Sequence, residues 1–220
     1  MNAMATSLDE YYRGFEAAAA ALVGRPQAAH DADPRTAAAA VHAASSAWLA
    51  AAPERPRACR SGCAHCCHFP VGVTFGEALL LHEALAQQGA EQHQRVLAAA
   101  RAPGDALPWT ELVGHACPLL EHGRCSVYAA RPLPCRALAS SDANACAAAL
   151  HGTGAVPRDD VAFWRGVGAV AALGRDEPVG SRELRSALLA LHAVLGERPS
   201  GAKAELAAVL ASFAAARPVP

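Results

Sequence analysis

The sequence predicts a mostly α-helical protein in which alanine-rich helices enclose a small, irregular, cysteine-rich module. Hydrophobic residues make up 53% of the 220 residues, but aromatic residues make up only 5%, because much of the apolar content is alanine. Alanine is the best helix former and fills little core volume. All eight cysteines lie between residues 59 and 146, where proline and glycine repeatedly interrupt the helical patterns.

Charge and hydropathy argue against several classes of partner. The net charge is −1, and no basic stripe is present to neutralise phosphates, so we expect no nucleic-acid binding. The longest apolar runs are short alanine tracts, well below the ~20 residues of a membrane-spanning helix. The first residues lack the basic start and apolar run of a signal peptide. We therefore expect a cytoplasmic protein without membrane contact, in a reducing compartment where cysteines indicate metal or redox sites.

Residues 1–52 are predicted to form an N-terminal helical extension. Tyrosine, phenylalanine and leucine recur at helical spacing over residues 7–23, and this helix ends before Pro26. A second helix is predicted from Arg35 to Ala51. The aromatic residues of both helices are expected to pack in the core.

Residues 53–152 are predicted to form the cysteine-cluster domain. Thr74 and Glu77 match a capping box at the start of a helix that fades near Gln87, and Glu77 is interpreted as a cap alone. Another helix is expected over residues 91–101.

The second half of this domain is expected to be more irregular. Gly123 indicates a tight turn. One or two helical turns over residues 126–131 are expected to be cut short by Pro132 and Pro134. A short helix over residues 142–150 would carry the last cysteine.

Residues 153–220 are predicted to form C-terminal helices packed on this domain. Helices are expected from a cap at Asp159 or Asp160 to about Leu173, from Ser181 onward, and from Lys203 to Ala216. The tail after Ala216 is expected to be frayed.

The cysteine spacing favours a metal site. Cys63 and Cys66 have the two-residue spacing of a metal-binding knuckle. The neighbouring side chains of Cys66 and Cys67 diverge, so the two seldom bind one ion. Either one of them lies beside the metal without binding it, or the pair serves a multinuclear cluster or two nearby sites. Eight thiolates would suffice for two four-cysteine sites. The candidate metal ligands are Cys59, Cys63, Cys66, Cys67, Cys117, Cys125, Cys135 and Cys146, and the nearby nitrogen donors are His65, His68, His115 and His122.

Other uses of cysteine fit less well. Burial as small hydrophobic residues could explain one or two of the eight, but not four within nine residues. Structural disulfides would require export. A thioredoxin-like dithiol would require a βαβ pattern, which is missing.

The cysteine motifs occur in an order that resembles a known family. The chain reads Gly62-Cys-x-x-Cys-Cys67, then Val71-x-Val-Thr-x-x-Glu-Ala78, then Cys117-Pro-Leu-Leu-x(4)-Arg-Cys-Ser-Val-Tyr-x-x-Arg-Pro-x-x-Cys-Arg136. This order resembles the YkgJ-type cysteine-cluster family, a zinc- or iron-chelating domain with a Cys-x-x-Cys-x-x-Cys-Cys signature. The resemblance covers roughly residues 59–146.

The first gap of this signature is three residues here instead of two, so Cys59 does not match the usual first position. Some related proteins are flagellin lysine methylases, but this chain has no glycine-rich nucleotide loop after a strand, so their activity does not carry over.

The resemblance implies roles for individual residues. It implies metal ligation by the six cysteines from Cys63 to Cys135, with Cys59 and Cys146 as further ligands. It also singles out Tyr128, Arg131 and Arg136 around the cofactor. Arginines beside a thiolate-bound metal would donate hydrogen bonds to sulfur and offset its negative charge.

Two functions follow from this reading. In the first, an iron–sulfur cluster serves electron transfer or the modification of another protein. In the second, structural zinc holds the loops together while the helices bind a protein partner. All-sulfur ligation fits both metals, and the adjacent cysteine pair tilts the prediction slightly toward iron–sulfur. No catalytic triad, carboxylate pair or phosphate loop is present, so the sequence assigns no catalytic residue and no small-molecule substrate. A shared site requires the two cysteine groups to converge.

Overall fold

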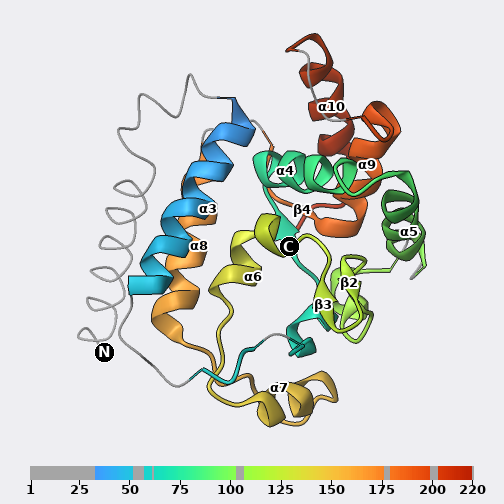
Figure 1. The fold of residues 1–220 in the computed structure, drawn as a ribbon. Helices are drawn as coiled ribbons and strands as arrows, with labels where there is room; N and C mark the ends of the chain where they lie inside the picture. Colours follow the sequence, from blue (N-terminus) through green and yellow to red (C-terminus); the bar gives the residue numbers. More distant parts are fainter. Residues whose placement is uncertain are drawn as a thin grey trace.

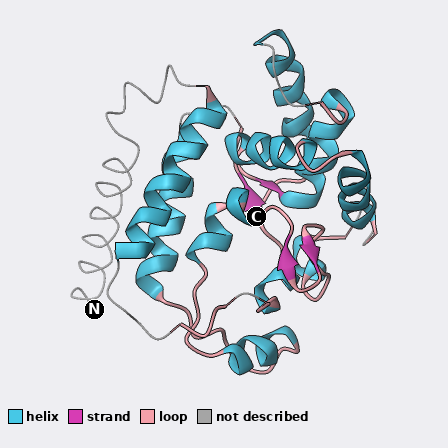
Figure 2. Cartoon of the chain, in the orientation of Figure 1, coloured by secondary structure: helices cyan, strands magenta, loops and turns pink. Residues whose placement is uncertain are grey.

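The computed structural model describes residues 33–51, 57–60, 62–102, 107–175, 179–198 and 203–219. These residues form helices joined by irregular segments and two small two-stranded sheets (Figures 1 and 2), which confirms the predicted mostly α fold. The predicted helix at residues 7–23 lies outside the described residues. None of the described helices is both long and apolar enough to cross a membrane. The division of the chain into three parts stays a prediction.

Helix α3 (Pro34–Ala51) coincides with the second predicted helix and lies beside α8 (Asp160–Arg175) in Figure 1. It also packs on α4 (Phe75–Ala86). The two helices approach closely because Gly76 has no side chain: a Cβ there would collide with the carbonyl oxygen of Pro34. Small residues thus bring these helices together, as the alanine-rich composition predicts. On α3, Ala38 and Val41 form a buried cluster with Leu133 and with Ala169 and Leu173 of α8.

The capping box before α4 is confirmed. The Thr74 hydroxyl accepts a hydrogen bond from the Glu77 amide at 3.4 Å, and the Glu77 carboxylate accepts one from the Thr74 amide at 3.0 Å. Strand β1 (Gly72–Val73) leads into this cap and pairs antiparallel with β4 (Arg182–Glu183). The short extended segment before the cap is therefore part of a sheet.

The helix that was predicted to begin at Ser181 begins three residues later. Helix α9 (Leu184–Leu195) begins after β4, not at Ser181. The Glu183 carboxylate accepts hydrogen bonds from the amides of Arg185 and Ser186, so a glutamate acts as the N-cap. Serine is a common N-cap, but here Ser181 belongs to the segment that leads into the sheet.

The segment between α5 (Ala90–Arg101) and the second sheet contains one turn of 3₁₀ helix, η2 (Trp109–Leu112). Strands β2 (Leu120–Glu121) and β3 (Arg124–Cys125) then form a hairpin. Its two turn residues, His122 and Gly123, have φ values of 46° and 75°. Two consecutive positive φ angles match the twist of a tight hairpin, which confirms the predicted turn.

Four short helical elements complete the cysteine-rich region. These are η1 (His65–His68), η3 (Tyr128–Ala130), α6 (Leu133–Ala137) and α7 (Ala143–Leu150). The last matches its prediction, and Asp142 is its N-cap. Helix α6 was not predicted, because Pro132 and Pro134 were expected to end helical structure. They instead fall at its N-cap and in its first turn, where proline costs no hydrogen bond.

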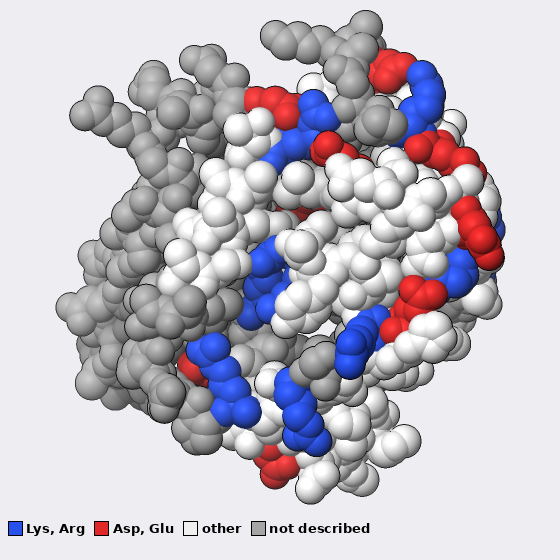
Figure 3. Space-filling model, viewed as in Figure 1, with Lys and Arg blue, Asp and Glu red and all other residues white. Residues whose placement is uncertain are grey.

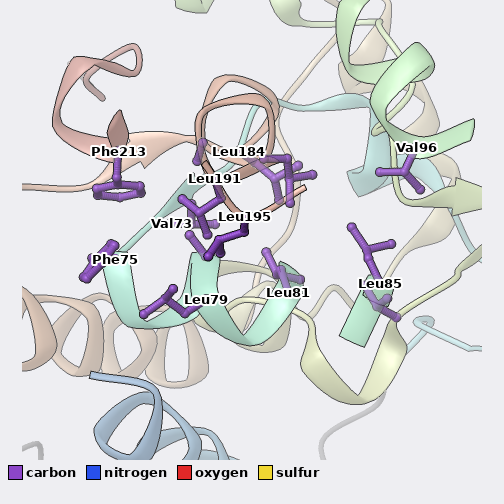
Figure 4. Packing of buried hydrophobic residues seen from close by; sticks show 14 of the residues in the cluster. Val73, Phe75, Leu79, Leu81, Leu85, Val96, Leu184, Leu191, Leu195 and Phe213 are labelled. Atoms are coloured by element: carbon purple, nitrogen blue, oxygen red, sulfur yellow. The ribbon is translucent and has the colours of Figure 1, made fainter. Parts of the chain in front are cut away.

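The main core lies where α4, α9 and α10 (Lys203–Ala215) meet, as Figure 4 shows. Phe75 and Phe213 pack against each other with ring centroids 5.3 Å apart. The predicted frayed tail is wrong for its described part. The Arg217 amide donates to the Ser186 hydroxyl, and Pro218 forms a β-bridge with Arg182, so the tail is tied to β4.

Glu77 has a larger role than capping. Its side chain is fully buried, and its second oxygen accepts a hydrogen bond from the Leu133 amide at 2.7 Å. That oxygen also lies 3.2 Å from Nε2 of His42 on α3. One carboxylate therefore joins the N-termini of α4 and α6 to the middle of α3.

We expect Glu77→Ala to lower the free energy of unfolding by about 3 kcal/mol or more, because two buried amides would lose their acceptor. Urea unfolding followed by circular dichroism measures this change. Glu83→Ala, at a partly exposed position of the same helix, is the matched control, with an expected change within about 0.5 kcal/mol. Equal effects of the two substitutions would contradict the linking role of Glu77.

Candidate metal centre

The two cysteine groups meet at one cavity of about 600 Å³. The predicted convergence is therefore confirmed for six of the eight cysteines. The six that line the cavity are Cys63, Cys66, Cys67, Cys117, Cys125 and Cys135.

Local turns place the first three cysteines. The Cys63 amide donates to the Arg60 carbonyl at 2.9 Å, and the Cys67 amide donates to the Ala64 carbonyl at 3.0 Å. The second turn is the start of η1, which carries Cys66 and Cys67 side by side. Backbone turns of this kind let cysteines two or three residues apart face one space.

A backbone contact joins the second group to the first. The Cys117 amide donates to the Cys67 carbonyl at 2.6 Å, and the Gly114 amide donates to the His68 carbonyl at 2.8 Å. The hairpin that follows returns the chain, so that Cys125 pairs with Leu120 across the two strands. The tight turn at Gly123 therefore holds Cys125 near Cys117.

The last wall of the cavity comes from α6. Cys135 lies in this five-residue helix, whose first amide is fixed by Glu77. On its other face α6 packs closely on α8: a Cβ at Gly166 would collide with the Ala137 side chain. The position of Cys135 thus depends on contacts with α4 and α8, both distant in sequence.

Cys59 and Cys146 lie outside the lining of this cavity, although both were predicted as ligands. The Ser140 amide donates to the Cys59 sulfur at 3.3 Å, and Cys146 is buried on α7. Ligation by these two cysteines stays a prediction.

All eight cysteines are free thiols in the structure. None of His65, His68, His115 and His122 lines the cavity. The Nδ1 atom of His68 instead lies 3.1 Å from the Ala64 carbonyl oxygen.

Arginines supply the charge around the cavity. Arg60, Arg124 and Arg131 contribute to its lining, and no aspartate or glutamate of the described residues does. Figure 3 shows several basic side chains around the middle of one face, separated by uncharged atoms and without a continuous basic patch. The cavity therefore suits a group of net negative charge, as a thiolate-bound metal would be.

Arg131 and Tyr128 form one unit at this site. The Arg131 guanidinium lies over the Tyr128 ring, 4.0 Å from its centroid. The Nε atom of Arg131 is buried and has no hydrogen-bond partner among the described residues. Tyr128 lines the cavity and is 61% exposed, so the cavity reaches the protein surface here.

The third residue singled out by the motif, Arg136, has other contacts. Its guanidinium donates to the backbone carbonyls of Ala129 and Arg131 and to the Ser46 hydroxyl. It is absent from the cavity lining. A contact between Arg136 and a cofactor stays a prediction.

The protein environment lowers the pKa of one cavity thiol and raises the pKa of several others. A hydrogen bond from the Cys67 thiol lowers the pKa of Cys66, and the same interaction raises the pKa of Cys67. Burial raises the pKa of Cys117 to about 11 and raises those of Cys125 and Cys135. Near neutral pH most of these thiols are therefore protonated until a cation displaces their protons.

Comparison with known families agrees with this chemistry. Residues 58–152 match the model of the CxxCxxCC family, described as a putative zinc- or iron-chelating domain. This segment is similar to a CxxCxxCC domain. Its six clustered thiols agree with a zinc- or iron-binding module. No curated protein and no solved structure matches the chain.

We expect the cavity cysteines of the CxxCxxCC domain to differ from Cys59 in metal retention. Cys135→Ser should reduce the bound metal at least about tenfold, because a ligand is lost. Cys59→Ser is the matched control and should keep the metal, since it lies outside the lining and serine can still accept from the Ser140 amide. Metal per protein, measured by plasma mass spectrometry after gel filtration, tests this. Equal loss in both variants would contradict a site centred on the cavity.

Proposed function

We propose that the cysteine cavity holds an iron–sulfur cluster with a redox role, in electron transfer to another protein or in its modification. The observation that carries this proposal is the meeting of six thiols, two of them adjacent in sequence, around one cavity of about 600 Å³. A cluster of several irons bridged by sulfide spreads its cysteine ligands over a larger frame than one ion does. The adjacent pair Cys66 and Cys67 suits a cluster with several metal corners.

The surroundings of the cavity favour a cofactor that a partner protein can approach over an enclosed structural zinc ion. Structural zinc sites are enclosed by four protein ligands. Here Tyr128 is largely exposed at the cavity, so a partner protein can come close to a bound cluster. The unpaired Nε of Arg131 is available to donate a hydrogen bond to a cluster sulfur.

The knuckle turns at Cys63 and Cys66 also suit zinc, so the metal itself is the first thing to measure. We expect protein purified without oxygen to contain iron and acid-labile sulfide and to be coloured. Its visible absorption should bleach with dithionite and should be lost in air. Elemental analysis with a visible spectrum measures this. Stoichiometric zinc without iron or sulfide would refute the proposal and leave a structural zinc site, which should unfold when chelated.

We expect Arg131→Gln to make the reduction potential of the cluster more negative, because the substitution removes a positive charge and a donor beside it. Protein-film voltammetry measures this potential. Arg101→Gln, at the exposed end of α5, is the control for a change in total charge and should leave the potential unchanged. An unaltered potential in Arg131→Gln would show that this arginine only packs on Tyr128.

A further inference from the structure

Three histidines meet between helices α4, α5 and α9, outside the cysteine cavity. His82 is on α4, His93 on α5 and His192 on α9. One ring nitrogen from each lies within 4.8 Å of the others, and within the described part of the chain no other group of three metal-binding side chains is this close. None of the three lines the cysteine cavity.

The backbone fixes the tautomers of two of the rings. Nε2 of His82 and Nδ1 of His192 each lie 3.0 Å from the carbonyl oxygen of Gly196. A carbonyl oxygen only accepts hydrogen bonds, so each of these nitrogens must carry a hydrogen. The lone pairs are then left on Nδ1 of His82 and Nε2 of His192. Histidines that bind metals are commonly held in this way, with the second nitrogen donating to a carbonyl.

The lone pair of His82 is not used within the described structure, and a ring nitrogen of His93 is in the same situation. The side chains of His82 and His93 are about 1% exposed, and Nδ1 of each is buried without a hydrogen-bond partner in the described residues. The rings contact edge to face, with centroids 5.1 Å apart for each neighbouring pair. Buried polar atoms without a partner are rare in native proteins and call for an explanation.

We infer that His82, His93 and His192 form a second metal site, for a divalent cation of the zinc class bound through imidazole nitrogen. Imidazole suits zinc, cobalt, nickel and copper, whereas magnesium and calcium prefer oxygen. Three histidines leave a fourth position for water.

The charge and protonation of the surroundings agree with a cation. Burial lowers the pKa of His82 and lowers that of His93 to about 4, so both rings are neutral near pH 7, which is the form that binds metal. Glu197 lies near His93 and accepts a hydrogen bond from the Gln94 side chain at 2.8 Å. Its negative charge favours a cation at the histidine cluster. A bound ion would join α4, α5 and α9, and would stabilise the folded chain by mass action.

Titration with Co²⁺ tests this site, because tetrahedral cobalt gives visible bands and thiolate ligands add a separate charge-transfer absorption in the near ultraviolet. We expect the wild-type protein to take up one more equivalent than His192→Gln, in a component without thiolate absorption. We also expect His192→Gln to weaken that component by at least about tenfold. His151→Gln, at an exposed histidine, is the matched control and should behave as wild type. Mg²⁺ should produce no change.

A second measurement needs no substitution. Addition of Zn²⁺ to wild-type protein should shift the ring ¹⁵N resonances of all three histidines and raise the thermal midpoint. Equal cobalt uptake by wild type and His192→Gln would overturn the inference. Ring resonances that stay unchanged with excess Zn²⁺ would also overturn it, and the three rings would then be core packing alone. Neither outcome bears on the cysteine cavity, because the cobalt component is identified by its lack of thiolate absorption.

Discussion

A single buried carboxylate holds the framework of the cysteine cavity. Glu77 accepts from the amide of Thr74, the N-cap of α4, accepts from the first amide of α6, and contacts His42 on α3. The burial of a charged side chain is costly unless it is well paired, and here several donors surround it. Since α6 carries Cys135, the same carboxylate that starts a helix also sets the position of one cavity wall. Stability and the geometry of the metal centre therefore depend on the same group.

The cavity itself combines two opposing electrostatic tendencies. Burial raises the pKa of Cys117, Cys125 and Cys135, whereas metal ligation requires thiolates. Arg60, Arg124 and Arg131 lie around it without an acidic neighbour in the lining, so the site is prepared for negative charge that appears when metal binds. This arrangement couples metal uptake to proton release. Among the lining arginines, Arg131 has a buried Nε without a hydrogen-bond partner in the described residues.

Helices α4 and α9 support the surroundings of the cysteine cavity and also carry histidines of the second cluster. Helix α9 contributes Leu184 to the cavity lining and His192 to the histidine cluster, while α4 carries both Glu77 and His82. Two sites with different donors thus share the same two helices, one with sulfur and one with nitrogen. Sulfur-rich sites favour soft metals and iron–sulfur clusters, whereas imidazole sites suit zinc-class ions. This chemical difference gives the two sites distinct spectroscopic signatures.

The local sequence determined the helices, caps and turns, whose interactions join residues close together in the chain. The helix over residues 35–51, the capping box at Thr74, the turn at Gly123 and the knuckle at Cys63 all arise from short-range sterics and hydrogen bonds. The order of the cysteine motifs also indicated metal binding. Tertiary structure alone decided which cysteines line the cavity, since Cys59 and Cys146 share the same motif region but lie outside it. It also decided the linking role of Glu77, the start of α6 after Pro132, and the meeting of three histidines from separate helices. Those features depend on packing between segments far apart in the chain, and neither periodicity nor motif spacing carries that information.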